Sequence, residues 1–116
     1  MNIEQLSKIC ESLHSVTTDV KWDNHLCFNI GEKMFFIASL ENLPVTASFK
    51  TTEEEFGEFI SQIGFSPAPY LGRYNWVHVD DIRRLSRIQW TEIIEKSYFL
   101  IASKISKRKK LELRIE

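Results

Sequence analysis

The chain has 116 residues, of which 43% are hydrophobic and 27% charged, and its formal net charge is −1. This length favours one domain, and the balance of apolar and charged residues excludes a disordered chain. No apolar run approaches the roughly 18 residues that a membrane-spanning helix needs. The chain opens without the basic and then apolar stretch of a signal peptide, and it holds two cysteines, Cys10 and Cys27. We therefore expect a cytoplasmic protein with free, buried thiols and no membrane association.

Charge is distributed unevenly along the chain. Residues 1–72 hold four Lys or Arg against ten Asp or Glu, whereas residues 73–116 hold eleven against six. Such asymmetry can mark a surface for nucleic acid or for an acidic partner. The alternative is that both signs mix once the chain folds, because two halves of a sequence are not two halves of a surface.

The first third of the chain predicts a helix followed by a hairpin. Residues 2–14 carry apolar side chains at helical spacing, and Asn2 is suited to cap the first turn. From Val20 the period changes to two, which predicts strand structure up to residue 30 and a further strand over 33–39. Gly31-Glu32 between them indicates a type II′ turn. Because residues 34–38 are apolar on both faces, we expect this strand to be central and covered on both sides.

The middle of the chain predicts a strand, a helix and another strand. Residues 45–50 alternate between apolar and polar, and Thr51 and Thr52 then begin two overlapping capping boxes that open a helix. A short strand is expected over 75–79, with Trp76 and His78 on one face. Residues 80–86 are polar and indicate a turn or short helix.

The clearest element is the last one. Apolar side chains from Trp90 to Ile105 fall at helical spacing and predict a helix over about 89–105. Lys104 and residues 107–110 extend its end, where cations meet the negative helix terminus. The order of helix, three strands, helix, strand and helix predicts an α+β fold. We expect a single two-layer domain over 1–116, with an antiparallel sheet of about four to five strands, helices packed against it and a basic tail at about 106–116.

No catalytic or metal-binding constellation stands out. The chain has no phosphate loop, zinc-finger spacing or nucleophile elbow. His25 and Cys27 share a strand face but lack the further ligands that a stable metal site needs. His78 beside two aspartates has a general-base alternative, which we weigh below a solvated turn. We therefore predict a non-enzymatic protein without metal or cofactor.

Basic residues offer the strongest functional signal. Clustered Lys and Arg supply the salt-sensitive, sequence-independent part of nucleic-acid binding. Aromatic residues interleaved with a cation are suited to stacking on bases. The alternative is a solvated helix tail beside ordinary core aromatics. The residues concerned are an arginine group at 83, 84 and 87, the four cations of 107–110, and the set Tyr70, Arg73, Tyr74 and Trp76.

The order and spacing of several segments resemble the MmcQ/YjbR family. The resemblance implies a compact fold likened to secretion chaperones and to the frataxin CyaY, and DNA binding through a double-wing motif of two hairpin-like projections. One wing would be the hairpin at Gly31-Glu32. The matching segments are the helix 3–13, the hairpin Phe28–Phe35, Ala47–Lys50 leading into an acidic helix, Pro69–Val79, and Ser97-Tyr98 followed by Lys104.

The same resemblance draws attention to one corner of the sheet. Lys50 ends a strand and Arg73 precedes one, so we expect them to meet beside Trp76 and to form an anion-binding corner. The alternative is that Trp76 is core and both cations pair with the acidic residues 53–55. The predicted nucleic-acid or anion-binding residues are Lys50, Arg73, Trp76, Arg83, Arg84, Arg87, Lys107 and Arg108.

The sequence is compatible with three functions. The first is DNA binding, mainly through the phosphate backbone. The second is a protein-partner module that uses an exposed apolar patch or a sheet edge. The third is a small-ligand binder for anions, built around Tyr70, Arg73, Trp76 and His78, which a pocket joining these side chains would favour. We expect a monomer in each case.

Overall fold

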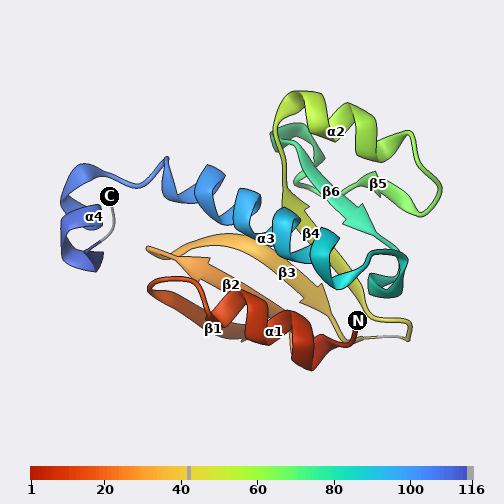
Figure 1. Cartoon of the computed structure of the whole chain (residues 1–116), viewed down its shortest axis with the longest axis horizontal. Coiled ribbons are helices and arrows are strands. Elements are labelled where there is room, and N and C mark those ends of the chain that lie inside the picture. Colours follow the sequence, from red (N-terminus) through yellow and green to blue (C-terminus); the bar gives the residue numbers. More distant parts are fainter. Residues whose placement is uncertain (42, 115–116) are drawn as a thin grey trace.

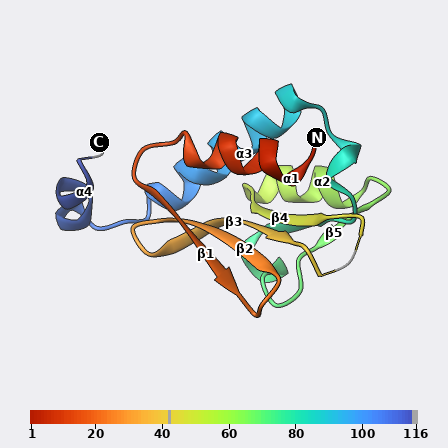
Figure 2. The same ribbon diagram turned by 90° about the horizontal axis from the view of Figure 1, so that it is seen from below.

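A six-stranded antiparallel sheet organises the chain, in a computed structural model that describes residues 1–41 and 43–114. Helices pack on one face of this sheet, as Figures 1 and 2 show from two directions. The α+β class and the single compact unit agree with the sequence, but the sheet has more strands than expected. In spatial order they are β1 (Val16–Lys21), β2 (His25–Ile30), β3 (Lys33–Ser39), β4 (Thr46–Lys50), β6 (Trp76–Val79) and β5 (Phe65–Pro67).

The core lies between the sheet and the longest helix, α3 (Arg87–Ala102). Trp90 of α3 is fully buried, and its ring meets the rings of Phe36 and Phe49 edge-on at 5.7 and 5.8 Å. Such edge-to-face pairs add about 0.5–1.5 kcal/mol beyond area burial. The other helices are α1 (Ile3–Glu11), α2 (Glu53–Ile60) and α4 (Lys107–Leu113), with 3₁₀ turns η1 (Gly72–Tyr74) and η2 (Ile82–Arg84). Among the described residues, no helix is long and apolar enough to cross a membrane.

The two strands absent from the sequence-based expectation are edge strands. β1 is largely exposed and carries Thr17, Thr18 and Asp19, so it lacks the alternation that marks a half-buried strand. β5 has three residues and ends in Pro67, which an edge strand tolerates because proline has no N–H to donate. Both positions therefore give weak sequence signals.

The turn between β2 and β3 differs from the expected type and is covered. Gly31 and Glu32 have φ values of 56° and 69°, and two positive values fit a type I′ turn, not type II′. A Cβ on Gly31 would lie 2.9 Å from Ile105 Cδ1 and 3.4 Å from Leu113 Cδ1. The hairpin tip therefore packs against the C-terminal segment and does not project as a separate wing.

The C-terminal helix is interrupted. α3 ends at Ala102, and α4 begins after Ser106, whose side chain accepts a hydrogen bond from the Lys109 N–H. The cations of 107–110 therefore start a helix and do not extend the end of α3. The first three of them meet the positive helix end, so for these the favourable dipole interaction expected from the sequence is reversed, whereas Lys110 lies in the last turn of α4.

A β-bulge decides what each face of β3 carries. Phe28 pairs with Phe36 while Asn29 pairs with Met34, which leaves Phe35 as the extra residue. The ring centroids of Phe35 and Tyr98 of α3 are 5.5 Å apart, so Phe35 lies on the same face of the sheet as Phe36, which contacts Trp90 of α3. Met34 remains half-buried and lines a groove on the opposite face. β3 is central, as expected, but helices cover only one of its faces.

Candidate functional site

The predicted cations fall into two groups at opposite ends of α3. Arg83 and Arg84 belong to η2 just before this helix, and Arg87 is its first residue. Lys107 and Arg108 follow its end. A helix of 16 residues is about 24 Å long. The residues nominated from the sequence therefore do not form one patch.

The arginines before α3 are held by neighbouring carboxylates. Arg83 pairs with Asp81 at 2.8 Å, and Arg84 pairs with Asp80 at 2.5 Å. The hydrogen bond from the Arg83 side chain is the largest cause that lowers the pKa of Asp81 to about 2. These pairs neutralise the charge locally. The pairs fix the turn after β6, whereas Arg87 is exposed and takes part in no ion pair among the described residues.

Beyond the other end of α3, Lys104 approaches Lys50 of β4, and Lys50 contacts the segment that carries Arg73. The Lys50 ammonium donates a hydrogen bond to the carbonyl oxygen of Tyr74. Burial, and next the nearby Lys104 ammonium, lower the pKa of Lys50. The Arg73 guanidinium lies 4.9 Å over the ring of the adjacent Tyr74. We call Lys50, Arg73 and Lys104 the basic corner.

The basic corner confirms part of the expected geometry and corrects the rest. Lys50 does meet the turn that carries Arg73. Trp76, however, is 5% exposed, so it is core and cannot stack on a base. The alternative pairing of Lys50 and Arg73 with the acidic residues 53–55 is wrong as well, because Glu55 pairs with Lys96 at 3.1 Å. Lys104 is the residue that sequence reasoning missed at this site, since nothing local links it to Lys50.

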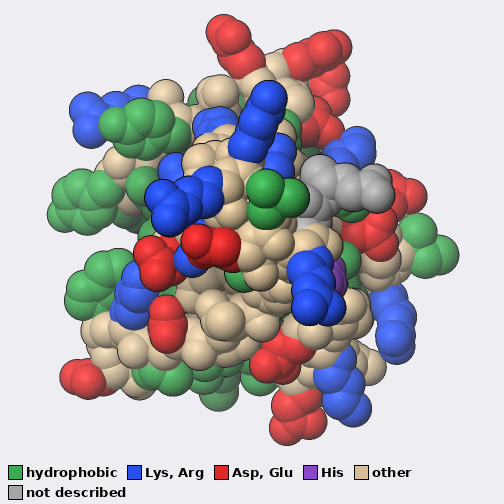
Figure 3. Space-filling model, turned by 90° about the vertical axis from the view of Figure 1, so that its left-hand side faces the viewer, with side chains coloured by type: hydrophobic (Ala, Val, Ile, Leu, Met, Phe, Trp, Pro, Cys, Tyr) green, Lys and Arg blue, Asp and Glu red, His purple; other side chains and the backbone are tan. Residues whose placement is uncertain are grey.

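Figure 3 looks onto the end of the molecule that carries α4. Lys and Arg side chains gather in the upper middle of this face, and Asp and Glu side chains lie above and below them. Lys107 and Arg108 are both exposed. The face is therefore locally basic within a surface of mixed charge.

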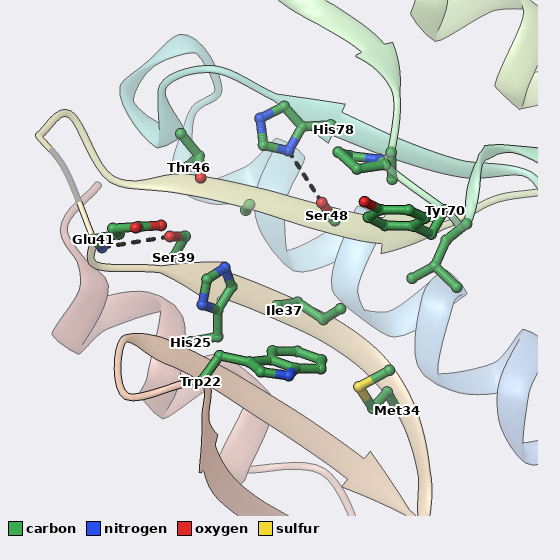
Figure 4. A pocket seen from close by; sticks show the side chains of 14 residues that line it. Trp22, His25, Met34, Ile37, Ser39, Glu41, Thr46, Ser48, Tyr70 and His78 are labelled. Carbon is green, nitrogen blue, oxygen red and sulfur yellow. Dashed lines mark hydrogen bonds between the residues drawn. The ribbon is translucent and has the colours of Figure 1, made fainter.

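A second feature is a groove of about 700 Å³ on the sheet face opposite α3. The strand register sets its floor, because Ile37, Ser48 and His78 are cross-strand neighbours on β3, β4 and β6. Trp22 and Tyr70 stand at opposite sides of the groove, and the rings of His25 and His78 point into it (Figure 4). The pocket thus includes Tyr70 and His78 of the ligand site considered from the sequence, while Arg73 and Trp76 are not among its lining residues.

The groove contains one serine–histidine contact. Ser48 Oγ lies 3.1 Å from Nδ1 of His78. Burial lowers the pKa of His78, against a smaller opposing effect of Asp80. This shift favours the neutral form of the ring. A hydrolytic pair also needs a group that orients the base, and the Asp80 carboxylate is occupied by Arg84. We interpret Ser48 and His78 as hydrogen-bonding groups.

One ring nitrogen of His25 has no hydrogen-bond partner among the described residues. This atom, Nδ1, is buried, and the ring meets Trp22 edge-on at 5.6 Å. Cys27, considered from the sequence with His25 as a metal ligand, is fully buried and forms no disulfide. Across the described residues, no three His, Cys, Asp or Glu side chains lie close enough to hold a metal ion.

A family model described as YjbR matches residues 11–100. The chain belongs to the YjbR family. The YjbR match includes the whole sheet, and so Lys50, Arg73 and the groove residues, whereas Lys104 and α4 lie beyond it. No curated protein matches the chain.

Two solved structures share this fold. A Deinococcus radiodurans protein that carries the domain DUF419 is 21% identical, with a TM-score of 0.87 over 99% of this chain and 89% of that chain. A Pseudomonas syringae protein is 18% identical, with a TM-score of 0.70 over 86% of this chain and 98% of that chain. At these identities the likeness shows the fold alone.

Proposed function

We propose that this YjbR protein is a non-enzymatic DNA-binding protein that contacts the phosphate backbone through the basic corner. The observation that carries the proposal is the approach of Lys50 and Lys104. Their charges are close enough for Lys104 to lower the pKa of Lys50. Within residues 1–41 and 43–114, neither lysine takes part in an ion pair.

An anion at this place would relieve two costs at once. Like charges held together repel, and Lys50, which is 7% exposed, has lost some of its hydration. A phosphate oxygen bound by the exposed Lys104, next to Lys50, would offset both, and charge-assisted hydrogen bonds of this kind are the stronger ones. Arg73 supplies a planar guanidinium over the ring of Tyr74, the residue whose carbonyl Lys50 contacts, and such a group is suited to bidentate phosphate contact.

Lys107 and Arg108 extend the same end of the molecule. Both are exposed and follow Lys104 closely in the chain. A row of cations contacts successive phosphates and fixes position on a duplex, but it carries no sequence information. We therefore expect similar affinity for unrelated sequences. Arg83, Arg84 and Arg87 take no part in this interface, because they lie at the other end of α3.

Binding of fluorescently labelled DNA of unrelated sequences tests the proposal. Duplexes and single strands are titrated with the full chain at low salt, and anisotropy reports the bound fraction. Lys104→Ala and Arg108→Ala together are expected to weaken binding by a similar factor for every sequence. Arg83→Ala removes the same kind of charge at the far end of α3 and is expected to leave the affinity unchanged. Undetectable binding to both forms of DNA would reject the proposal.

A further inference from the structure

The sheet face that no helix covers is more apolar than a solvent-facing sheet face usually is. A sheet covered on one side alternates apolar residues toward the core with polar residues toward water. Here Met34, Ile37 and Ala47 line the uncovered side, and Met34 lies there because the bulge at Phe35 turns two consecutive phenylalanines toward α3. The result is an apolar floor in a groove of about 700 Å³, within the size range of sites for small molecules.

Two aromatic side chains are held at the rim of this floor. Trp22 is 70% exposed and Tyr70 is 96% exposed, so neither contributes much to the core. Their φ values are 51° and 65°, in the left-handed region that bulky residues rarely adopt. Residues in such conformations are often found at ligand sites. Of the seven non-glycine residues of the described chain with positive φ, the two that line the groove are thus the aromatic residues at its rim.

The polar groups of the groove indicate an uncharged ligand. Of the described residues that line it, none is Lys or Arg, and one, Glu41, is acidic. The hydrogen-bonding groups are the paired Ser48 and His78 and, toward one end, Ser39, Thr46 and His25 (Figure 4). His25 Nδ1 lacks a partner in the described chain. A phosphate would find no counter-charge here, whereas a neutral molecule with a hydrogen-bonding group would find several partners.

From these three observations we propose that the groove binds a small, uncharged, flat aromatic molecule. The ligand rests on Met34 and Ile37, stacks against Trp22 and Tyr70, and bonds to the histidine and serine side chains. A flat ring suits this place because aromatic side chains recognise another π-system through stacking or edge-on contact. This site goes beyond DNA binding and shares no residue with the basic corner, so each can fail without the other.

Amide NMR spectra of the full chain, titrated with matched probes, test this site. The first pair is 2-naphthol and decahydro-2-naphthol, which differ in ring flatness. The second pair is adenosine and adenosine monophosphate, which differ in charge. We expect 2-naphthol and adenosine to shift the amides of Trp22, Ile37, Ser48 and His78 saturably. The saturated alcohol binds more weakly, and the phosphate gives no gain in affinity.

Three variants test whether the aromatic rings at the rim of the groove bind 2-naphthol. Trp22→Ala and Tyr70→Ala are each expected to weaken 2-naphthol binding roughly tenfold, in line with the loss of one stacking partner. Trp22→Phe keeps a ring and retains most of the affinity. Phe99→Ala is the matched control, because this aromatic is 63% exposed on α3, away from the groove. The proposal is overturned by the absence of saturable shifts, by tighter binding of the monophosphate, or by an equal loss in Phe99→Ala.

Discussion

The hydroxyl of Ser97 accepts a hydrogen bond from the backbone N–H of Lys50 at 2.8 Å. The same hydroxyl donates to the Phe35 carbonyl oxygen at 2.6 Å, and Ser97 is fully buried. One side chain of α3 thus joins β3 to β4 where the bulge disturbs the ladder. It also fixes the backbone of the lysine that anchors the basic corner.

Replacing Ser97 by Ala is expected to destabilise the fold. The change leaves a buried N–H and a buried carbonyl without their partner, at a cost of roughly 1–3 kcal/mol for an unsatisfied group. Urea denaturation measures the free energy of unfolding. Ser103→Ala is the control, since that hydroxyl is exposed and bonds only within its own helix turn. Equal stability of the two variants would show that the Ser97 bridge contributes little.

Two glycine substitutions are expected to act in opposite directions. Gly31→Ala places a Cβ at a φ of 56° and 2.9 Å from Ile105 Cδ1, so it should destabilise the fold. The left-handed conformation alone costs roughly 1–2 kcal/mol for a residue with a Cβ. Gly57→Ala adds a Cβ within α2 with nothing inside 4 Å, and it should stabilise by about 0.5–1 kcal/mol. Thermal unfolding distinguishes the two, and a rise in Tm for Gly31→Ala would contradict the described packing of the hairpin tip.

The aspartate–arginine pairs after β6 predict a loss of stability in acid. Hydrogen bonds from Arg83 and Arg84 lower the pKa of Asp81, to about 2, and of Asp80. A carboxylate with a lowered pKa in the folded state stabilises the fold above the ordinary carboxylate range near pH 4. This contribution is lost as the pH falls toward about 2. Carboxyl NMR should place the Asp81 transition near that value, and Arg83→Gln should raise it only part of the way toward the ordinary range, because the backbone N–H at this position still donates to the carboxylate. An unchanged transition in the variant would rule out this pairing.

The sequence predicts the parts of the fold that depend on long, regular patterns. α3 has a sustained apolar stripe, and β3 a continuous apolar run, so both were expected close to their observed places. β1 and β5 were missed because edge strands need little apolar alternation. The bulge that turns Phe35 and Phe36 to the same side has no sequence signal of its own. It explains why an apolar strand has one uncovered face.

The sites were harder to predict because they depend on tertiary contacts. The sequence suggested that the arginines near η2 and the α4 cations converge on one surface once the chain folds, but the length of α3 separates them. Lys104 reaches Lys50 only through the packing of α3 on the sheet. Trp22 follows no motif, and its left-handed backbone cannot be read from residue types. Binding of a protein partner and the monomeric state stay predictions.

The salt dependence of DNA binding is the sharpest test of a phosphate site at the basic corner. The logarithm of the association constant is plotted against the logarithm of salt concentration for the natural chain, Lys104→Ala and Arg83→Ala. Removing one cation that binds a phosphate should make the slope shallower by about 1. We expect this change for Lys104→Ala and an unchanged slope for Arg83→Ala. Identical slopes for all three proteins would contradict a phosphate site at the basic corner.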